Sequence, residues 1–201
     1  MNVEAAHALS TIGRDLAARG LLRATSGNLS VRLPNGFLVT ASGRDKGALG
    51  PDDFLVVNAA GAAQPGSPTP SAEAGLHAQL YAWDAEIGAV LHVHGHAAAV
   101  LGRVYESAGA IGFTGWEMAK ALRGVTSHHV RVDLPVFAND QDIDALALRI
   151  APHLRRDVPG YVLAGHGLYA WGRDLPEAVR HLDALDYLLN AELSLLSLRG
   201  I

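Results

Sequence analysis

The sequence predicts a single α/β domain in which a mixed β-sheet lies between layers of helices. Three observations support this prediction. Amphipathic helical patterns alternate with short apolar strands, a β-hairpin with a Pro-Asn-Gly turn lies near the start, and no linker, internal repeat or low-complexity tract interrupts the chain. With 201 residues, 49% of them hydrophobic, the chain can build one full core, so we expect one domain over residues 1–201.

The expected helices show apolar residues at intervals of three or four positions. The first carries Leu9, Ile12 and Leu16, and a glycine at position 20 ends it. Asn139 is expected to cap a helix that contains Ile143, because its side chain can accept from a free backbone N–H. The other helices are expected over residues 71–83, from about 97, over 115–122, and from Asp174 and Pro176 to 198.

The expected strands are short apolar runs bounded by turn residues. Residues 28–33 and 37–40 flank the turn at 34–36 and form the hairpin. The remaining strands are expected over residues 54–57, 88–94, 130–134, 161–166 and 168–171. The proline-rich residues 62–70 are expected to form a loop.

Three histidines stand at the ends of two apolar runs. His92 and His94 are separated by Val93, and side chains alternate between the faces of a strand, so the two imidazoles project together. His166 ends a second run of the same design. Three imidazoles would leave one position of a four-coordinate zinc ion open, as a catalytic site requires, and they also suit ferrous iron. The pattern therefore favours a catalytic metal site over three structural histidines.

Two short turns that combine hydroxyl residues with glycine flank the first hairpin, Thr25-Ser26-Gly27-Asn28 and Ala41-Ser42-Gly43. Backbone N–H groups in such turns can approach an anion, and serine or asparagine side chains add hydrogen bonds. The two turns can converge on one phosphate, with Arg44 and Lys46 as sources of positive charge. The alternative is that they are only solvated turns.

Two glutamates are candidates for acid–base chemistry. Glu73 begins the helix expected over 71–83, where it can also complement the helix dipole. Glu117 lies beside Trp116, where desolvation can raise its pKa towards useful values, or it can pair with Lys120 on the surface. The spacing alone does not choose between them.

Composition excludes several functions. The net charge is −4 and no basic cluster is present, so we expect no nucleic-acid partner. The lack of cysteine excludes disulfides, thiolate metal sites and a cysteine nucleophile, and makes the cytoplasm the expected compartment. The first 22 residues carry charges at short intervals, unlike a signal peptide, and no apolar stretch approaches 18 residues, so no membrane span is expected.

From residue 25 to its end, the chain resembles the class II aldolase/adducin family. The resemblance is carried by Thr25-Ser26-Gly27-Asn28, Ser42-Gly43, Pro70-Ser71-Ala72-Glu73, His92-Val93-His94 and Gly165-His166-Gly167. It implies a three-layer α/β/α sandwich around a mixed, largely antiparallel sheet, assembled as a homotetramer. It also implies one Zn²⁺ per subunit, or Fe²⁺, held by the three histidines, which stabilises an enediolate made from a phosphorylated ketose. The implied substrate and phosphate site comprises Ser26, Gly27, Asn28, Ser42, Gly43, Lys46 and Ser71.

Further stretches resemble the dehydratase members of this family, namely residues 42–47, Trp116-Glu117-Met118, residues 137–143 and residues 166–172. The implied reaction is dehydration of 5-methylthioribulose 1-phosphate, with Glu117 as the working acid/base. In aldolases of the family the working acid/base is a glutamate at the position of Glu73, and this chain has both Glu73 and Glu117. Phe113, Trp116 and Tyr169 are candidates for an apolar wall around the methylthio group.

Three alternatives remain open. A class II sugar-phosphate aldolase or 4-epimerase would use the same metal with Glu73 as the acid. A Schiff-base aldolase would use Lys46 or Lys120 without a metal. A non-catalytic member would use the fold for assembly, and the presence of all three histidines argues against that alternative.

Overall fold

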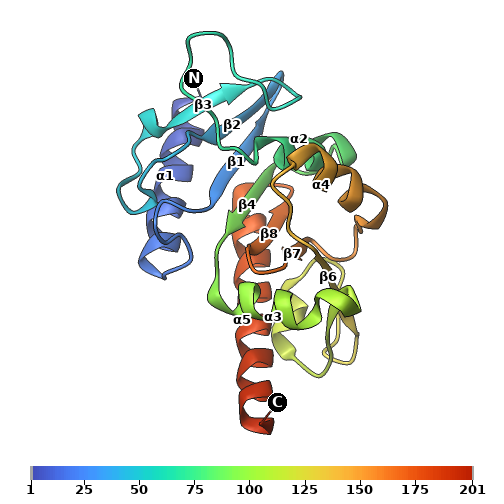
Figure 1. Cartoon of the computed structure of the whole chain (residues 1–201). Helices are drawn as coiled ribbons and strands as arrows, with labels where there is room; N and C mark the ends of the chain where they lie inside the picture. Colours follow the sequence, from blue (N-terminus) through green and yellow to red (C-terminus); the bar gives the residue numbers. More distant parts are fainter. Residues whose placement is uncertain (1, 201) are drawn as a thin grey trace.

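The computed structural model describes residues 2–200, and the strands in this range form one sheet in the order β3-β2-β1-β4-β8-β7-β6-β5 (Figure 1). Every neighbouring pair is antiparallel except β6 and β7, which run parallel. The expected mixed, largely antiparallel sheet is confirmed. The strands are β1 (Asn28–Leu33), β2 (Gly36–Thr40), β3 (Phe54–Val57), β4 (Ala89–Val93), β5 (Ala110–Phe113), β6 (Val132–Phe137), β7 (Gly160–Leu163) and β8 (Gly167–Gly172).

Helices cover both faces of the sheet and give the expected three layers. The helices are α1 (Val3–Ala18), α2 (Ala74–Trp83), α3 (His96–Tyr105), α4 (Ile143–Ile150) and α5 (Leu175–Arg199). One hydrophobic cluster joins the sheet to α1, α3 and α5, and a second joins its other face to α2 and α4. The C-terminal half of α5 extends beyond the sheet (Figure 1). None of the helices within residues 2–200 combines the length and hydropathy needed to cross a bilayer.

Side chains of the central strands alternate between the two faces of the sheet, and this alternation determines which residues face α2. On β4, Leu91 and Val93 belong to the cluster that contains α3 and α5, whereas Val90 belongs to the opposite cluster. His92 is on the side of Val90, so the predicted separation of the two histidines from Val93 is confirmed. Asn28 on β1 lies directly opposite His92 in the antiparallel register. The polar residues at this end of the sheet therefore face α2 and α4.

Several elements differ from the sequence prediction. Helix α2 begins at Ala74 and not at residue 71, because the backbone just before it is bonded to the end of β2 through Ser71 N to Thr40 O, 3.2 Å. Strand β5 was not predicted, since it has only four residues and contains a glycine. Residues 117–121 form a 3₁₀ turn in place of the expected α-helix, and the chain is extended again at Leu122.

The expectation that Asn139 caps α4 was wrong. The N-cap is Asp142, whose Oδ1 accepts from Ala145 N at 3.0 Å. The Asn139 side chain instead points towards His166, with Oδ1 3.0 Å from Nδ1 of that ring. Both residue types cap helices well, so sequence alone did not separate them.

We predict that Asp142→Ala lowers the free energy of unfolding by about 0.5–2 kcal/mol, because one N–H in the first turn of α4 loses its acceptor. Asn139→Ala, which removes an exposed side chain that bonds no helix N–H, serves as the matched control and should cost clearly less. Urea unfolding of both variants measures the difference. Equal losses would show that Asp142 does not stabilise the helix as its cap.

Candidate active site

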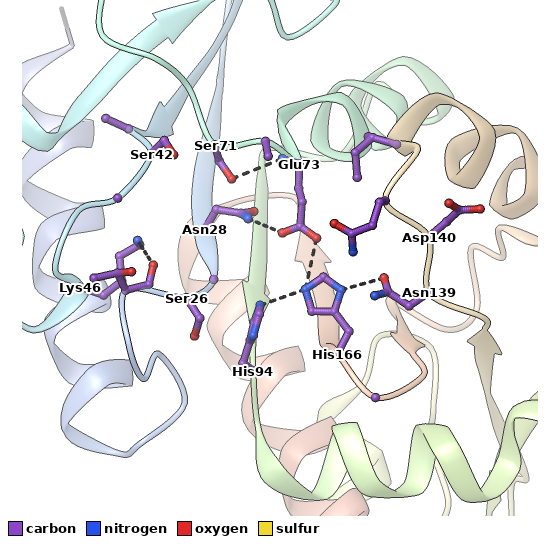
Figure 2. Close-up of a pocket in the computed structure, with 18 residues that line it drawn as sticks. Ser26, Asn28, Ser42, Lys46, Ser71, Glu73, His94, Asn139, Asp140 and His166 are labelled. Atoms are coloured by element: carbon purple, nitrogen blue, oxygen red, sulfur yellow. Dashed lines mark hydrogen bonds and ion pairs between the residues drawn. The ribbon is translucent and has the colours of Figure 1, made fainter.

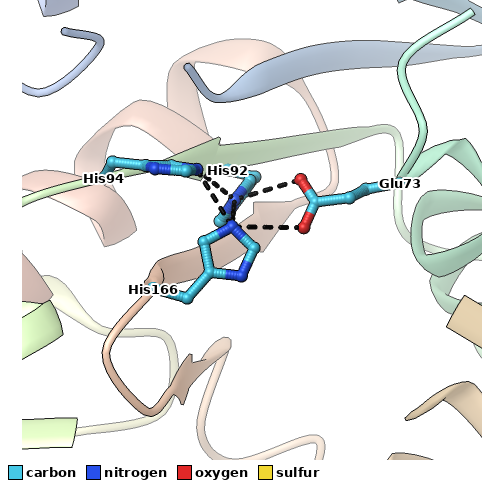
Figure 3. Close-up of side chains that lie close together, drawn as sticks. All are labelled: Glu73, His92, His94 and His166. Carbon is cyan, nitrogen blue, oxygen red and sulfur yellow. Dashed lines mark hydrogen bonds and ion pairs between the residues drawn. The ribbon is translucent and has the colours of Figure 1, made fainter. Parts of the chain in front are cut away.

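The three histidines predicted as metal ligands converge at one end of β4 (Figure 3). The Nε2 atom of His92 lies 3.0 Å from Nε2 of His94 and 3.3 Å from Nε2 of His166. The remaining pair, His94 and His166, are 3.1 Å apart at the same atoms. Ligand nitrogens on a tetrahedral zinc ion, with bonds of about 2.0–2.1 Å, are roughly 3.3 Å apart. The spacing therefore fits one shared ion.

The turn that carries His166 approaches β4 closely. Strand β7 ends at Leu163, so His166 lies in the turn between β7 and β8 rather than inside a strand. A Cβ atom on Gly167 would lie 2.2 Å from the carbonyl oxygen of Val93 and 3.1 Å from Cε1 of His92. Only glycine permits this approach, and the approach brings His166 next to the other two imidazoles.

The hydrogen bonds around two of the rings leave their converging nitrogens without hydrogens. Nδ1 of His92 lies 3.2 Å from the carbonyl oxygen of Leu168, and Nδ1 of His166 lies 3.0 Å from Oδ1 of Asn139. Both oxygens are acceptors, so we place the hydrogen of each neutral ring on Nδ1 and a lone pair on Nε2. Lone pairs that face one another at this distance repel unless a cation lies between them. The donor set thus fits a divalent metal.

Glu73 is the carboxylate of this cluster. Its Oε2 lies 3.2 Å from Nε2 of His92 and its Oε1 3.4 Å from Nε2 of His166. Burial alone would raise the pKa of Glu73, but its close contacts with the imidazoles of His92 and His166 and the hydrogen bond from Asn28 outweigh that effect and bring the pKa well below its usual range. Glu73 is therefore ionised and placed to act as a further ligand or as a base.

A cavity of about 510 Å³ opens at this cluster (Figure 2). That volume is typical of a small-molecule site. Glu73, His94 and His166 line one side, while the more deeply buried His92 supports them from behind. The residues of the implied substrate and phosphate site line the same cavity: Ser26, Gly27, Asn28, Ser42, Gly43, Lys46 and Ser71. Arg44, the other expected source of charge, does not line it and pairs with Asp53 at 3.4 Å.

Lys46 connects the two hydroxyl-glycine turns. Its side chain is buried, and Nζ donates to the carbonyl oxygens of Thr25 at 2.7 Å and Arg44 at 2.8 Å. Burial lowers the pKa of Lys46, and the nearby Asp45 and Asp53 oppose that shift. An ammonium group has three hydrogens, so one remains for a ligand in the cavity.

The turn that contains Thr25 and Gly27 is strained and packs directly on β4. Ala24 and Thr25 have left-handed backbone conformations, with φ of 51° and 61°. Gly27 also has a positive φ, 73°, and a Cβ atom there would lie 2.6 Å from the carbonyl oxygen of His92. Such conformations persist only where surrounding contacts hold them, and the Lys46 bond to Thr25 is one such contact.

Glu117 does not line this cavity in the described chain. Its side chain is 69% exposed in the 3₁₀ turn 117–121 and pairs with Lys120 at 2.7 Å and with His128 at 3.3 Å. The hydrogen bond and charge of Lys120 lower the pKa of Glu117, so the surface pair with Lys120 is the alternative that the structure confirms, and not a pKa raised by desolvation beside Trp116. Trp116 instead packs edge-to-face on Tyr187, with ring centroids 6.3 Å apart.

The aromatic residues expected to form an apolar wall do not line the cavity either. Phe113 is buried in the core beside α3 and α5. Tyr169 is fully buried and stacks on His92, with ring centroids 4.1 Å apart. Sequence reasoning missed the actual lining from residues 139–143, although it had singled out that stretch as a resemblance. The expectation of a cap at Asn139 concealed its contact with His166.

Residues 7–193 match the family described as Class II Aldolase and Adducin N-terminal domain. A methylthioribulose-1-phosphate dehydratase of Sorangium cellulosum is 48% identical over 189 residues, which cover 92% of this chain and 89% of that protein. A Bradyrhizobium protein of the same name is 47% identical over 201 residues, with 96% and 92% covered.

Solved structures show the same fold. The L-fuculose-1-phosphate aldolase from Thermus thermophilus superposes with a TM-score of 0.76 at 29% identity, covering 96% of each chain. A further L-fuculose 1-phosphate aldolase has a TM-score of 0.82 at 22% identity, covering 98% of this chain and 89% of that one. The family match, the near full-length relatives and the shared fold agree, and this chain belongs to the class II aldolase and adducin family.

Proposed function

We propose that this chain catalyses the zinc-dependent dehydration of 5-methylthioribulose 1-phosphate to 2,3-diketo-5-methylthiopentyl 1-phosphate, a step of methionine salvage in the cytoplasm. The observation that carries the proposal is the convergence of three imidazoles at a cavity lined by two hydroxyl-glycine turns and a buried lysine. Relatives that are 46–48% identical over nearly the whole chain are named for this dehydration, which supports the choice of substrate.

His92, His94 and His166 would hold the metal ion, and the same ligands accept Fe²⁺ in place of Zn²⁺. When bound, a divalent ion supplies Lewis-acid chemistry, because it polarises a ketone and neutralises negative charge that develops beside it. The Leu168 carbonyl and the Asn139 side chain orient two of the rings through their Nδ1 atoms.

The two turns would receive the substrate phosphate. Backbone N–H groups and hydroxyls at Ser26–Asn28, Ser42–Gly43 and Ser71 supply hydrogen bonds, and the free N–H of Lys46 supplies positive charge. Holding this end of the ketose fixes which carbons lie beside the three histidines, and that positioning lowers the barrier to reaction.

The dehydration removes the proton of C3 and the hydroxyl of C4, which leaves as water after it gains a proton, and the resulting enol tautomerises to the diketone. We assign this proton transfer to Glu117. Because Glu117 lies outside the cavity of its own chain, we infer that it serves a neighbouring copy in a homotetramer. An apolar patch beside it, formed by the exposed Met118 and Tyr187 and the half-buried Trp116, supports such an interface.

A sugar-phosphate aldolase or 4-epimerase is the second candidate, favoured by the position of Glu73 beside His92. In that case Glu73 would be the working acid and the substrate would undergo carbon–carbon cleavage or epimerisation. Incubation of the purified protein with 5-methylthioribulose 1-phosphate separates the two: dehydration gives the absorbance of a diketone, and aldol cleavage does not.

We predict close to one zinc-like ion per purified chain, measured by elemental analysis. His94→Ala should lose the ion, because removal of one imidazole leaves too few ligands to hold it. His96→Ala is the control, since His96 is exposed at the start of α3 and should leave the metal content unchanged. A full complement of metal after replacement of all three ligand histidines by alanine would place the ion elsewhere.

We predict that Ser42→Ala raises KM by about 10- to 150-fold with little change in kcat, because a lost hydrogen bond to a charged group costs about 1.5–3 kcal/mol. Ser67→Ala, in the exposed loop before α2, is the matched control. Steady-state kinetics measure both. An unchanged preference for phosphorylated over unphosphorylated substrate would show that the Ser42 turn does not bind phosphate.

We predict that Glu117→Gln lowers kcat by about 10²–10⁴ at unchanged metal content, since the amide cannot transfer the proton. Glu106→Gln, at another exposed position, is the control and should be silent. Glu73→Gln should cost about tenfold or more through its effect on the histidines. A silent Glu117→Gln together with an inactive Glu73→Gln would contradict the dehydratase assignment and favour the aldolase.

Mixing inactive chains tests whether Glu117 serves another copy. Glu117→Gln and His94→Ala chains, dissociated and reassembled together, should regain part of the activity, because some cavities then combine intact histidines from one chain with an intact glutamate from another. Each variant reassembled alone is the control. No recovery in a confirmed mixed oligomer would contradict the shared site.

A further inference from the structure

A line of buried polar groups runs from Glu73 into the interior between β1 and α2. Its members come alternately from the helix end and the strand, in the order Glu73, Asn28, His77, Ser30, Tyr81. They interleave because residues four apart on a helix and residues two apart on a strand each share a face. His77 at the centre is fully buried, and it is neither a member of the histidine cluster nor part of the cavity lining.

The hydrogen bonds in this line all run in one direction, with each donor on the side of Tyr81 and each acceptor on the side of Glu73. An ionised carboxylate only accepts, so Asn28 presents its NH₂ group to Glu73, with Nδ2 2.7 Å from Oε2. The oxygen of the same amide then faces His77. Because that oxygen can only accept, the His77 ring carries its hydrogen on Nε2 and donates it to Asn28 Oδ1.

The hydrogen bonds on the Nδ1 side of the His77 ring run in the same direction. A neutral imidazole with hydrogen on Nε2 accepts at Nδ1, so the Ser30 hydroxyl donates to Nδ1 across 2.6 Å. Ser30 in turn accepts from the Tyr81 hydroxyl, 2.7 Å away. Burial lowers the pKa of His77 to about 3, so the ring is neutral around pH 7.

We propose that His77 is a positioning residue, whose Nε2–H holds the Asn28 amide in the one orientation that donates to Glu73 and so fixes this carboxylate beside the three histidines. The inference rests on the metal site of the proposed function. Without this donor, the buried oxygen of Asn28 has no partner and the amide can rotate, so Glu73 is no longer held in place. Groups that must be ordered when the ion binds reduce its affinity.

Zinc affinity of the whole protein, measured by competition with a chelator, tests this role independently of turnover. His77→Leu keeps most of the volume but removes the donor, and we expect the Kd for Zn²⁺ to rise by about 10- to 100-fold. His77→Gln can place an N–H near the position of Nε2, so it should recover most of the affinity. Tyr81→Phe is the matched control, because it removes a buried hydroxyl of the same line that does not touch Asn28, and it should stay within about twofold.

A folded His77→Leu protein with the wild-type Kd for Zn²⁺ would overturn the proposal. An equal loss of zinc affinity in Tyr81→Phe would also overturn it, because the buried polar groups would then contribute only to stability. Imidazole ¹⁵N spectra of the wild-type protein give a second test that needs no variant to fold. They should show His77 neutral with its hydrogen on Nε2 from about pH 6 to 8. A hydrogen on Nδ1, or a protonated ring, would contradict the inference.

Different measurements would contradict the proposed function and the positioning role of His77. A wild-type protein that binds no Zn²⁺ would contradict the metal site, and the ¹⁵N spectra would still decide the orientation of His77. A protein that binds Zn²⁺ tightly but does not dehydrate the ketose would contradict the substrate, and the three Kd values would still test the positioning role.

Discussion

Three imidazole Nε2 atoms lie 3.0–3.3 Å from one another, and much of the structure serves to hold them there. Those of His92 and His166 face each other with lone pairs, which repel in the absence of a cation. His92 is fixed by its strand and by the Leu168 carbonyl, and His166 by a glycine-flanked turn and Asn139. The close approach of Gly167 to β4 brings the two elements together. The fold therefore opposes the repulsion before any ion arrives, which is the preorganisation that a catalytic metal site needs.

The remaining walls of the cavity are attached to the same strand. The strained turn at Ala24–Asn28 packs on the backbone of His92, and the buried Lys46 ties that turn to the one after β2. A phosphate held by these turns would thus sit at a fixed distance from the metal ligands. On the opposite wall, Glu73 is the N-cap residue of α2 and His77 lies one turn later, so one helix carries both the carboxylate and the ring that supports it through Asn28.

Local patterns in the sequence were sufficient to predict the parts of the site that depend on local geometry. The two-residue period of a strand predicted that His92 and His94 share a face, and small hydroxyl-glycine turns predicted residues that do line one cavity. Contacts across the fold were not predictable from spacing. The pairing of Asn139 with His166, the burial of Lys46 and the interleaving of β1 with α2 all depend on how distant segments pack. Glu117 remains a prediction, because the described chain places it on an exposed face.

The proposed activity requires that these three imidazoles bind one ion. X-ray absorption of the zinc-loaded protein measures the ligand shell directly. The structure predicts three imidazole nitrogens, with one or two oxygens, at about 2.0–2.2 Å from the metal. A shell with fewer than two imidazoles, or one that is unchanged when His166 is replaced by alanine, would contradict a metal site formed by these three histidines.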